Sequence, residues 1–131
     1  MIYLQTIPNF LFFFAAAIAY GAAYLFIYTR ITPWAELELI RKGNDAAAIS
    51  LAGASLGFAI PLASATANSL NLIDMAVWGF VAMVIQLGVF FVARWAKPGL
   101  AADIEAGKTA TSVSYAAFAL GVGLLNAACM S

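Results

Sequence analysis

Residues 27–46, IYTRITPWAELELIRKGNDA, decide the fold of this chain because they place a cluster of charges between two long apolar segments. This stretch holds six of the twelve charged residues, and residues 94–108 hold five more. Asp74 is the one charged residue elsewhere. The clusters divide the 131 residues into four apolar segments, which is the pattern of a polytopic membrane protein.

The composition points to the same class of protein. The chain is 65% hydrophobic and 9% charged, with a mean hydropathy of +0.96, whereas soluble proteins are about 45 to 50% apolar and about 25% charged. Six basic residues balance six acidic ones, so nucleic acid is not an expected partner. The chain has no histidine and one cysteine, Cys129, which excludes Cys-His metal motifs and a Ser-His-Asp triad. We expect no cofactor, no metal site and no catalytic residues.

Four membrane-spanning helices are predicted, because a bilayer core of about 30 Å needs about 20 apolar residues. We place them at residues 8–30, 46–68, 74–95 and 108–130, within a single transmembrane domain over residues 1–131. Every Lys and Arg lies in the first or third connection. The positive-inside rule then predicts that both connections are cytoplasmic and both termini are outside.

An internal repeat emerges when the chain is compared with itself at an offset of about 64 residues. Arg30 then matches Arg94, and Gly43 matches Gly107. Pro33 matches Pro98 after a slip of one residue. The predicted fold is therefore an all-α membrane protein built from two parallel-related helical hairpins, residues 8–68 and 74–130.

Short interfacial helices are predicted in the two connections. In the first, Thr32 is the expected N-cap, Pro33 the first helical residue and Gly43 the stop, with Glu36 near the positive end of the helix dipole. The apolar face of this segment consists of Trp34, Leu37 and Ile40 and lies opposite Glu38, Arg41 and Lys42. This arrangement suits a helix lying in the headgroup region. The second helix is expected within residues 98–107, and a solvated loop is the alternative for each.

Small and polar residues follow one face of the second span, at spacings of three or four: Ser50, Gly53, Gly57, Pro61, Ser64 and Asn68. This face is either a packing seam between helices or the lining of a pore, and we favour packing because small-xxx-small faces are common in membrane bundles. Gly121 and Asn126 in the fourth span, and Gln86 in the third, belong to the same set of packing or pore-lining candidates. Asn126 and Tyr115 lie on nearly one helical face and could form a polar contact.

No charged residue lies in the central part of any predicted span, which argues against a proton relay or a voltage sensor. Asp74, at the start of the third span, is interpreted as an N-cap. Cys129 is interpreted as a small buried residue.

Several runs of residues together resemble the YjfL family of uncharacterised bacterial inner-membrane proteins. The runs are 26–33 FIYTRITP, 38–47 ELIRKGNDAA, 56–62 LGFAIPL, 78–79 WG, 84–87 VIQL and 126–130 NAACM. The resemblance covers almost the whole chain and implies a small four-span inner-membrane protein with a duplicated two-helix unit. It carries over no catalytic or ligand residues. Genes of the family often lie near those for PspA-like membrane-remodelling proteins, which implies a role in envelope maintenance or stress.

Two functions follow as hypotheses. The first is a non-enzymatic, homo-oligomeric membrane protein of envelope maintenance, whose cytoplasmic connections could dock a cytosolic PspA-like protein. The alternative is a homo-oligomeric channel or facilitator for ions or small solutes.

Overall fold

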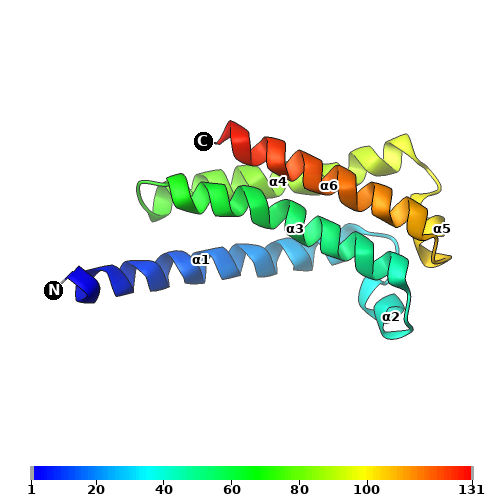
Figure 1. The fold of residues 1–131 in the computed structure, drawn as a ribbon, viewed down its shortest axis with the longest axis horizontal. Coiled ribbons are helices and arrows are strands. Elements are labelled where there is room, and N and C mark those ends of the chain that lie inside the picture. Colours follow the sequence, from blue (N-terminus) through cyan, green and yellow to red (C-terminus); the bar gives the residue numbers. More distant parts are fainter. Residues whose placement is uncertain (1, 131) are drawn as a thin grey trace.

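The computed structural model describes residues 2–130, with side chains described from Thr6 onward, and over these residues it contains helices but no strand. Six helices follow one another along the chain (Figure 1): α1 Ile2–Ile31, α2 Glu36–Arg41, α3 Asp45–Asn68, α4 Leu72–Ala96, α5 Leu100–Glu105 and α6 Thr109–Cys129. The four long helices are long and apolar enough to cross a membrane. The predicted all-α, four-span membrane fold is therefore confirmed, with α1 beginning earlier than expected.

Asparagine side chains define the start of two long helices. Asn44 accepts a hydrogen bond from the Ala47 N–H over 3.1 Å and caps α3. Asn71 accepts from the Asp74 N–H over 2.9 Å and caps α4. Asp74 reaches back to the Leu70 N–H over 3.1 Å, so backbone donors at the start of α4 are satisfied from both sides. The interpretation of Asp74 as the N-cap is wrong: it is the reciprocal partner of the true cap, Asn71.

The predicted start of the first short helix is also wrong. Thr32 does not cap α2, which begins at Glu36 with Ala35 in the N-cap position and no capping side chain. The Thr32 hydroxyl instead bonds back to the Thr29 carbonyl. The capping preference of Thr32 and Pro33 does not decide where α2 begins, because the chain between α1 and α2 instead buries Trp34 in the core.

Both short helices end in the same way. Gly43 and Gly107 have φ angles of 85° and 79°, the left-handed region that a residue with a Cβ rarely adopts. After α2, the Asn44 N–H bonds to the Leu39 carbonyl; after α5, the Lys108 N–H bonds to the Asp103 carbonyl. Each is a Schellman ending, which satisfies free helix carbonyls and turns the chain into the next span.

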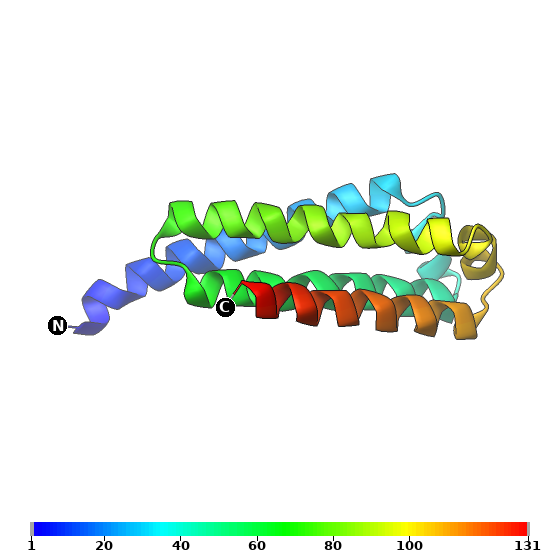
Figure 2. The same cartoon turned by 90° about the horizontal axis from the view of Figure 1, so that it is seen from above.

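The long helices form a bundle in which α3 and α6 run in the same direction, side by side (Figures 1 and 2). They make the most extensive contact of any two elements, and α4 packs against both. The first helix, α1, crosses the bundle obliquely, and its N-terminal part projects beyond it (Figure 2). Only 6% of the residues in the apolar membrane-spanning part of α1 are buried, against 50% in that of α3.

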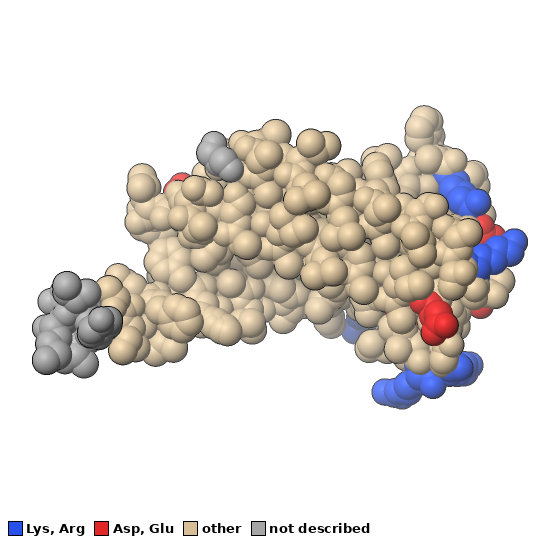
Figure 3. Space-filling view, viewed as in Figure 1, with Lys and Arg blue, Asp and Glu red and all other residues tan. Residues whose placement is uncertain are grey.

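Both connections lie at one end of the bundle, which we call the charged end. Figure 3 shows the Lys and Arg side chains gathered there, over α2 and α5. The two chain ends and the turn between α3 and α4 lie at the other end (Figure 1). The two hairpins thus point the same way, and the ends of the long helices at the charged end coincide with the charge clusters of the sequence.

Candidate functional site at the charged end

The two connections are joined to each other at the charged end. The Asn44 side chain that caps α3 also donates from Nδ2 to the Ile104 carbonyl over 2.9 Å, at the end of α5. One residue therefore links the first connection to the second, and α2 and α5 both pack against α3. Because of this bond, the connections form one continuous surface, which we call the platform: α2, α5 and their flanking turns.

Beneath the platform lies a buried acidic side chain, Glu36, in the first turn of α2. It is 2% exposed, and both of its carboxylate oxygens are buried without a hydrogen-bond partner. Burial raises the pKa of the Glu36 carboxyl from 4.5 to about 7. The Thr32 hydroxyl and the Trp34 indole N–H lie close enough to oppose this rise, although neither makes a hydrogen bond of ordinary geometry with the carboxylate.

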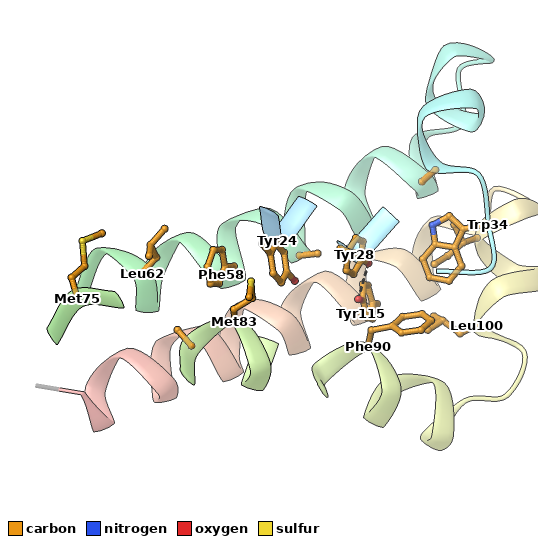
Figure 4. Packing of buried hydrophobic residues seen from close by; sticks show 14 residues of the cluster. Tyr24, Tyr28, Trp34, Phe58, Leu62, Met75, Met83, Phe90, Leu100 and Tyr115 are labelled. Atoms are coloured by element: carbon orange, nitrogen blue, oxygen red, sulfur yellow. Dashed lines mark hydrogen bonds between the residues drawn. The ribbon is translucent and has the colours of Figure 1, made fainter. Parts of the chain in front are cut away.

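Aromatic side chains surround this part of the core. The Tyr28 and Tyr115 hydroxyls share a hydrogen bond of 2.7 Å that joins α1 to α6 (Figure 4). Trp34 packs edge-on against Phe90 of α4, with ring centroids 5.6 Å apart. Tyr24 lies one helical turn before Tyr28, with ring centroids 5.8 Å apart. These phenols are within electrostatic range of Glu36. We call Tyr28, Trp34, Glu36 and Tyr115 the Glu36 cluster.

In the second connection, the carboxylate of Asp103 has charged and hydrogen-bonding partners. Asp103 of α5 accepts a hydrogen bond from the Thr111 hydroxyl over 2.9 Å and pairs with Lys97 at 3.3 Å and Lys108 at 3.4 Å. The Thr111 hydroxyl and the two ammonium groups lower the pKa of Asp103. Asp103 thus has a hydroxyl and two cations as partners, whereas Glu36 has no cation and no hydrogen bond of ordinary geometry.

Sequence reasoning missed this role of Glu36, since it placed the residue only by its position near a helix dipole. A signal was present in the neighbouring residues: Trp34 lies two positions away, and the four tyrosines of the predicted spans include Tyr24, Tyr28 and Tyr115. Large aromatic side chains that end in a polar group need a partner when they are buried. Their pairing across two helices could not be read from a single chain without the fold.

A groove of about 530 Å³ opens between α4, α5 and α6 beside this cluster. Most of its lining is apolar, including Val92, Leu100 and Phe118, and Lys97 and Tyr115 contribute to its wall. Tyr115 of the tyrosine pair therefore borders a cavity that reaches the surface of the bundle.

The small-residue face of α3 lies against α6. Ser50, Gly53, Gly57 and Pro61 are all buried. A Cβ added to Gly57 would lie 2.7 Å from the Ala119 carbonyl oxygen, and one added to Gly53 would overlap Ala116. The backbones approach so closely here that larger residues do not fit.

The other candidates on this face have different surroundings. The Ser64 hydroxyl donates to the Ala127 carbonyl of α6 over 3.1 Å, while Asn68 is exposed and donates to the Ser64 carbonyl. Gly121 has open space around its α-carbon. Gly123 is instead the α6 glycine that meets α3, at the Gly57 carbonyl.

Two amides are buried inside the bundle. Gln86 of α4 donates from Nε2 to the Ala119 carbonyl over 3.4 Å, but its Oε1 has no partner. Asn126 of α6 is buried, and its Nδ2 has no partner. Asn126 makes no hydrogen bond with Tyr115, because eleven residues of α6 separate them by about 16 Å along the helix, and the Tyr115 hydroxyl bonds to Tyr28 instead.

The first connection does not present its apolar residues on one face. Trp34 precedes α2 and is buried in the core, whereas Leu37 is 63% exposed. Ile40 is half-buried and packs against the core. Arg41 and Lys42 are exposed, and Lys42 pairs with Glu38 at 3.4 Å. At the other end of the molecule, Cys129 is exposed rather than buried as expected, since it lies in the last turn of α6.

Comparison with known proteins identifies relatives over the whole chain. A family model described as Domain of Unknown Function (DUF350) matches residues 1–130. The UPF0719 inner membrane protein YjfL of Escherichia coli (strain K12) is 39% identical over 128 residues, which cover 98% of this chain and 97% of that protein. The UPF0719 transmembrane protein YshE of Bacillus subtilis (strain 168) is 26% identical over 112 residues, covering 86% of this chain and 84% of that protein. No solved structure matches the chain.

Proposed function

Because the chain belongs to the DUF350 family and is similar to the inner membrane protein YjfL, we propose that it is a non-enzymatic docking protein of the inner membrane. In this proposal the platform faces the cytoplasm and holds a cytosolic partner against the bilayer. The process served is envelope maintenance, including the response to membrane stress.

The observation that carries the proposal is the bond from Asn44 to the Ile104 carbonyl. Two loops that merely joined spans would not need to be tied to each other. Here the tie holds the start of α3 against the end of α5, and a surface held in place binds partners at a smaller entropic cost than a mobile one. The platform also presents charged groups to water, including Glu38, Arg41, Lys42 and Glu105.

The proposed partner is a PspA-like membrane-remodelling protein, which is the association that the YjfL-type resemblance implies. A protein that works on the bilayer surface would meet the platform at the same height as the lipid headgroups. Basic residues at this boundary also attract anionic lipids, at about 1 kcal/mol for each Lys or Arg near the surface. Platform and lipid would then hold the partner together.

Assembly with further copies is part of the proposal. An apolar groove of about 860 Å³ runs between α1 and α3, with Phe10, Ile18 and Leu62 among its lining residues. Interfaces between spans form by close packing of such surfaces. The exposed N-terminal half of α1 is the element best placed to enter the groove of a neighbouring copy.

We also infer that the chain is a duplicated unit of span, short helix and span. The support is that corresponding features recur at the same offset of 64: α3 and α6 begin at Asp45 and Thr109, and the left-handed glycines are Gly43 and Gly107. The two copies are residues 8–68 and 74–130.

Co-sedimentation with proteoliposomes tests the docking function. A purified PspA-like protein is expected to sediment with vesicles that contain this chain more strongly than with empty vesicles of the same lipid. Reversing two charges of the platform, Arg41→Glu with Lys42→Glu, should abolish the difference, because both side chains are exposed on α2. The control is Leu70→Glu, which adds negative charge at the opposite end, where Leu70 is 91% exposed.

Equal binding to empty vesicles, or equal binding by the charge-reversed variant, would contradict this function. Native mass spectrometry from mild detergent tests assembly separately. A strictly monomeric chain would remove oligomerisation from the proposal and leave docking intact.

The alternative function, a homo-oligomeric channel or facilitator, has one observation in its favour. Gln86 and Asn126 each keep a buried polar atom without a hydrogen-bond partner, and such atoms can coordinate a passing solute. Flux of ions or small polyols into proteoliposomes, lost in Gln86→Leu, would support this alternative; no flux above empty vesicles would contradict it.

A further inference from the structure

Glu36 stands apart from the other charged residues in the part of the chain that the structure describes. It alone is buried. Glu38 pairs with Lys42, and Asp103 pairs with Lys97 and Lys108. A buried carboxylate without a cation or a hydrogen-bond donor is costly, and such a group normally becomes neutral by taking up a proton.

The surroundings of Glu36 supply no cation to change this. The ionisable groups within electrostatic range are phenols, Tyr24 and Tyr28 from α1 and Tyr115 from α6. Phenols carry no charge near neutral pH. Phe90, the nearby residue of α4, is apolar. The acidic residues of α3 and α5 do not face Glu36, because Asp45 and Glu105 are exposed and Asp103 is paired with Lys97. On α2 itself, Glu38 and Arg41 are exposed.

We propose that the Glu36 carboxyl is a proton-binding site and that its proton holds α2 docked on the bundle. Loss of this proton places an uncompensated charge under the platform. The charge reaches water only if α2 and the preceding turn move away from the helices beneath them. Proton binding would thereby set the position of half of the platform.

The geometry of α2 allows such a movement. The helix has six residues, and no side chain caps its N-terminus. An isolated helix shorter than about 12 residues is marginal in water, so packing must hold it in place. The fully buried residues that pack it down are Trp34 and Glu36, with the half-buried Leu39 and Ile40 beside them. Gly43, which follows its last turn, has a backbone conformation open to more than one arrangement because it lacks a Cβ.

The direction of the pH effect follows from the two conformations. An undocked Glu36 would titrate near its ordinary pKa of 4.5, whereas the docked carboxyl titrates at about 7. Docking is therefore fully favoured below about pH 4.5, weakens as the pH rises towards 7, and levels off above it. The difference of 2.5 pH units corresponds to a docking equilibrium weakened by up to about 300-fold.

Tryptophan fluorescence can report on this movement in the full chain without any partner protein. The chain has three tryptophans, and replacing the two exposed ones, Trp78→Phe and Trp95→Phe, leaves Trp34 as the sole fluorophore. In lipid nanodiscs, quenching of Trp34 by aqueous acrylamide is expected to rise as the pH is raised from about 5 to about 8. Glu36→Gln, which stays neutral, should keep Trp34 shielded throughout.

Glu38→Gln is the matched control, because it removes a carboxyl from the exposed side of the same helix and should leave the response unchanged. Quenching that does not change with pH in the Trp34-only protein, or that changes equally in Glu36→Gln, would overturn the proposal. Since no partner is present, this outcome is independent of the docking function.

A second measurement covers the case in which Glu36→Gln does not fold. The chain contains three glutamates, Glu36, Glu38 and Glu105. Carbon-13 labelling of their carboxyl groups gives three resonances by solid-state NMR in proteoliposomes, assigned with Glu38→Gln and Glu105→Gln. The Glu36 resonance is expected to titrate at about 7, well above the ordinary glutamate pKa of 4.5. Three coincident titrations would overturn the proposal.

Discussion

At the scale of single residues, the glycines of α3 and α6 differ in what surrounds them. The position that a Cβ would take at Gly57 lies within contact distance of the Ala119 carbonyl and the Gln86 side chain. Gly121, which lies 64 residues further along, has open space at the corresponding position. The same residue type therefore serves close packing at one position and leaves room at the other.

Gly57→Ala is expected to destabilise the bundle by about 1 to 3 kcal/mol, because the added Cβ would lie 2.7 Å from a backbone oxygen that cannot rotate away. The matched control, Gly121→Ala, should be neutral or stabilising by up to about 1 kcal/mol, since alanine costs less helix entropy. Thermal unfolding in detergent, followed by circular dichroism, distinguishes them. Equal melting temperatures for the two variants would show that α3 and α6 are not in close contact at Gly57.

The sequence was informative for α3 at this scale and less so for α6. The spacing of Ser50, Gly53, Gly57 and Pro61 placed them on one face, because a helix of known period needs no neighbour to define its faces. In α6, the choice between Gly121 and Gly123 depends on the rotation of that helix about its own axis. Only packing against α3 sets that rotation, and the apolar residues all round α6 carry no signal for it.

At the scale of elements, the two asparagine caps differ in the number of helices that their side chains contact. Asn71 satisfies a backbone N–H of α4 and bonds to no other helix through its side chain in the described hydrogen bonds. Asn44 caps α3 and in addition reaches the end of α5. Comparing the two separates the cost of losing a cap from the cost of separating the connections.

Asn44→Ala is expected to lower stability by about 1 kcal/mol for the cap and by about 1 kcal/mol more for the lost bond to the Ile104 carbonyl. Asn71→Ala should lower stability only by the contribution of the cap, about 1 kcal/mol. Hydrogen exchange measured by mass spectrometry should also show faster exchange in α5 for Asn44→Ala and unchanged α5 exchange for Asn71→Ala. If α5 exchanges equally in both variants, the connections are not coupled through Asn44.

The long elements could be predicted from the sequence because length and apolar character suffice to define a membrane span. The start of α2 could not. Thr32 and Pro33 carry the local signals of a helix start, but the burial of Trp34 in the core moves the start to Glu36. The burial of Glu36 follows from the same tertiary contact, and a helix dipole argument alone would have left its carboxylate in water.

At the scale of the whole molecule, the platform lies at one end of the bundle and the chain ends lie at the other. All six Lys and Arg residues lie in the connections or in the last turn of the span before them, so the positive-inside rule predicts a cytoplasmic platform. The single cysteine, exposed at the end of α6, offers a direct test of this orientation.

Cys129 is expected to react with a membrane-impermeant maleimide in intact spheroplasts, because both chain ends are predicted to face outward. The counterpart is Leu37→Cys in a Cys129→Ser background, which moves the thiol to an exposed position of α2. This variant should react only after the membrane is permeabilised. The reverse pattern would invert the molecule in the membrane and place the platform outside.

The oblique course of α1 connects the protein to the thickness of its membrane. The span Thr6–Ile31 has 26 residues and that of α6 has 21, which correspond to about 39 Å and about 32 Å of helix. A hydrocarbon core of about 30 Å accommodates α6 upright but forces α1 to tilt. We therefore expect the angle between α1 and the rest of the bundle to respond to lipid as well as to packing: a thicker bilayer should draw α1 upright, and a thinner one should lay it further across the surface of α3.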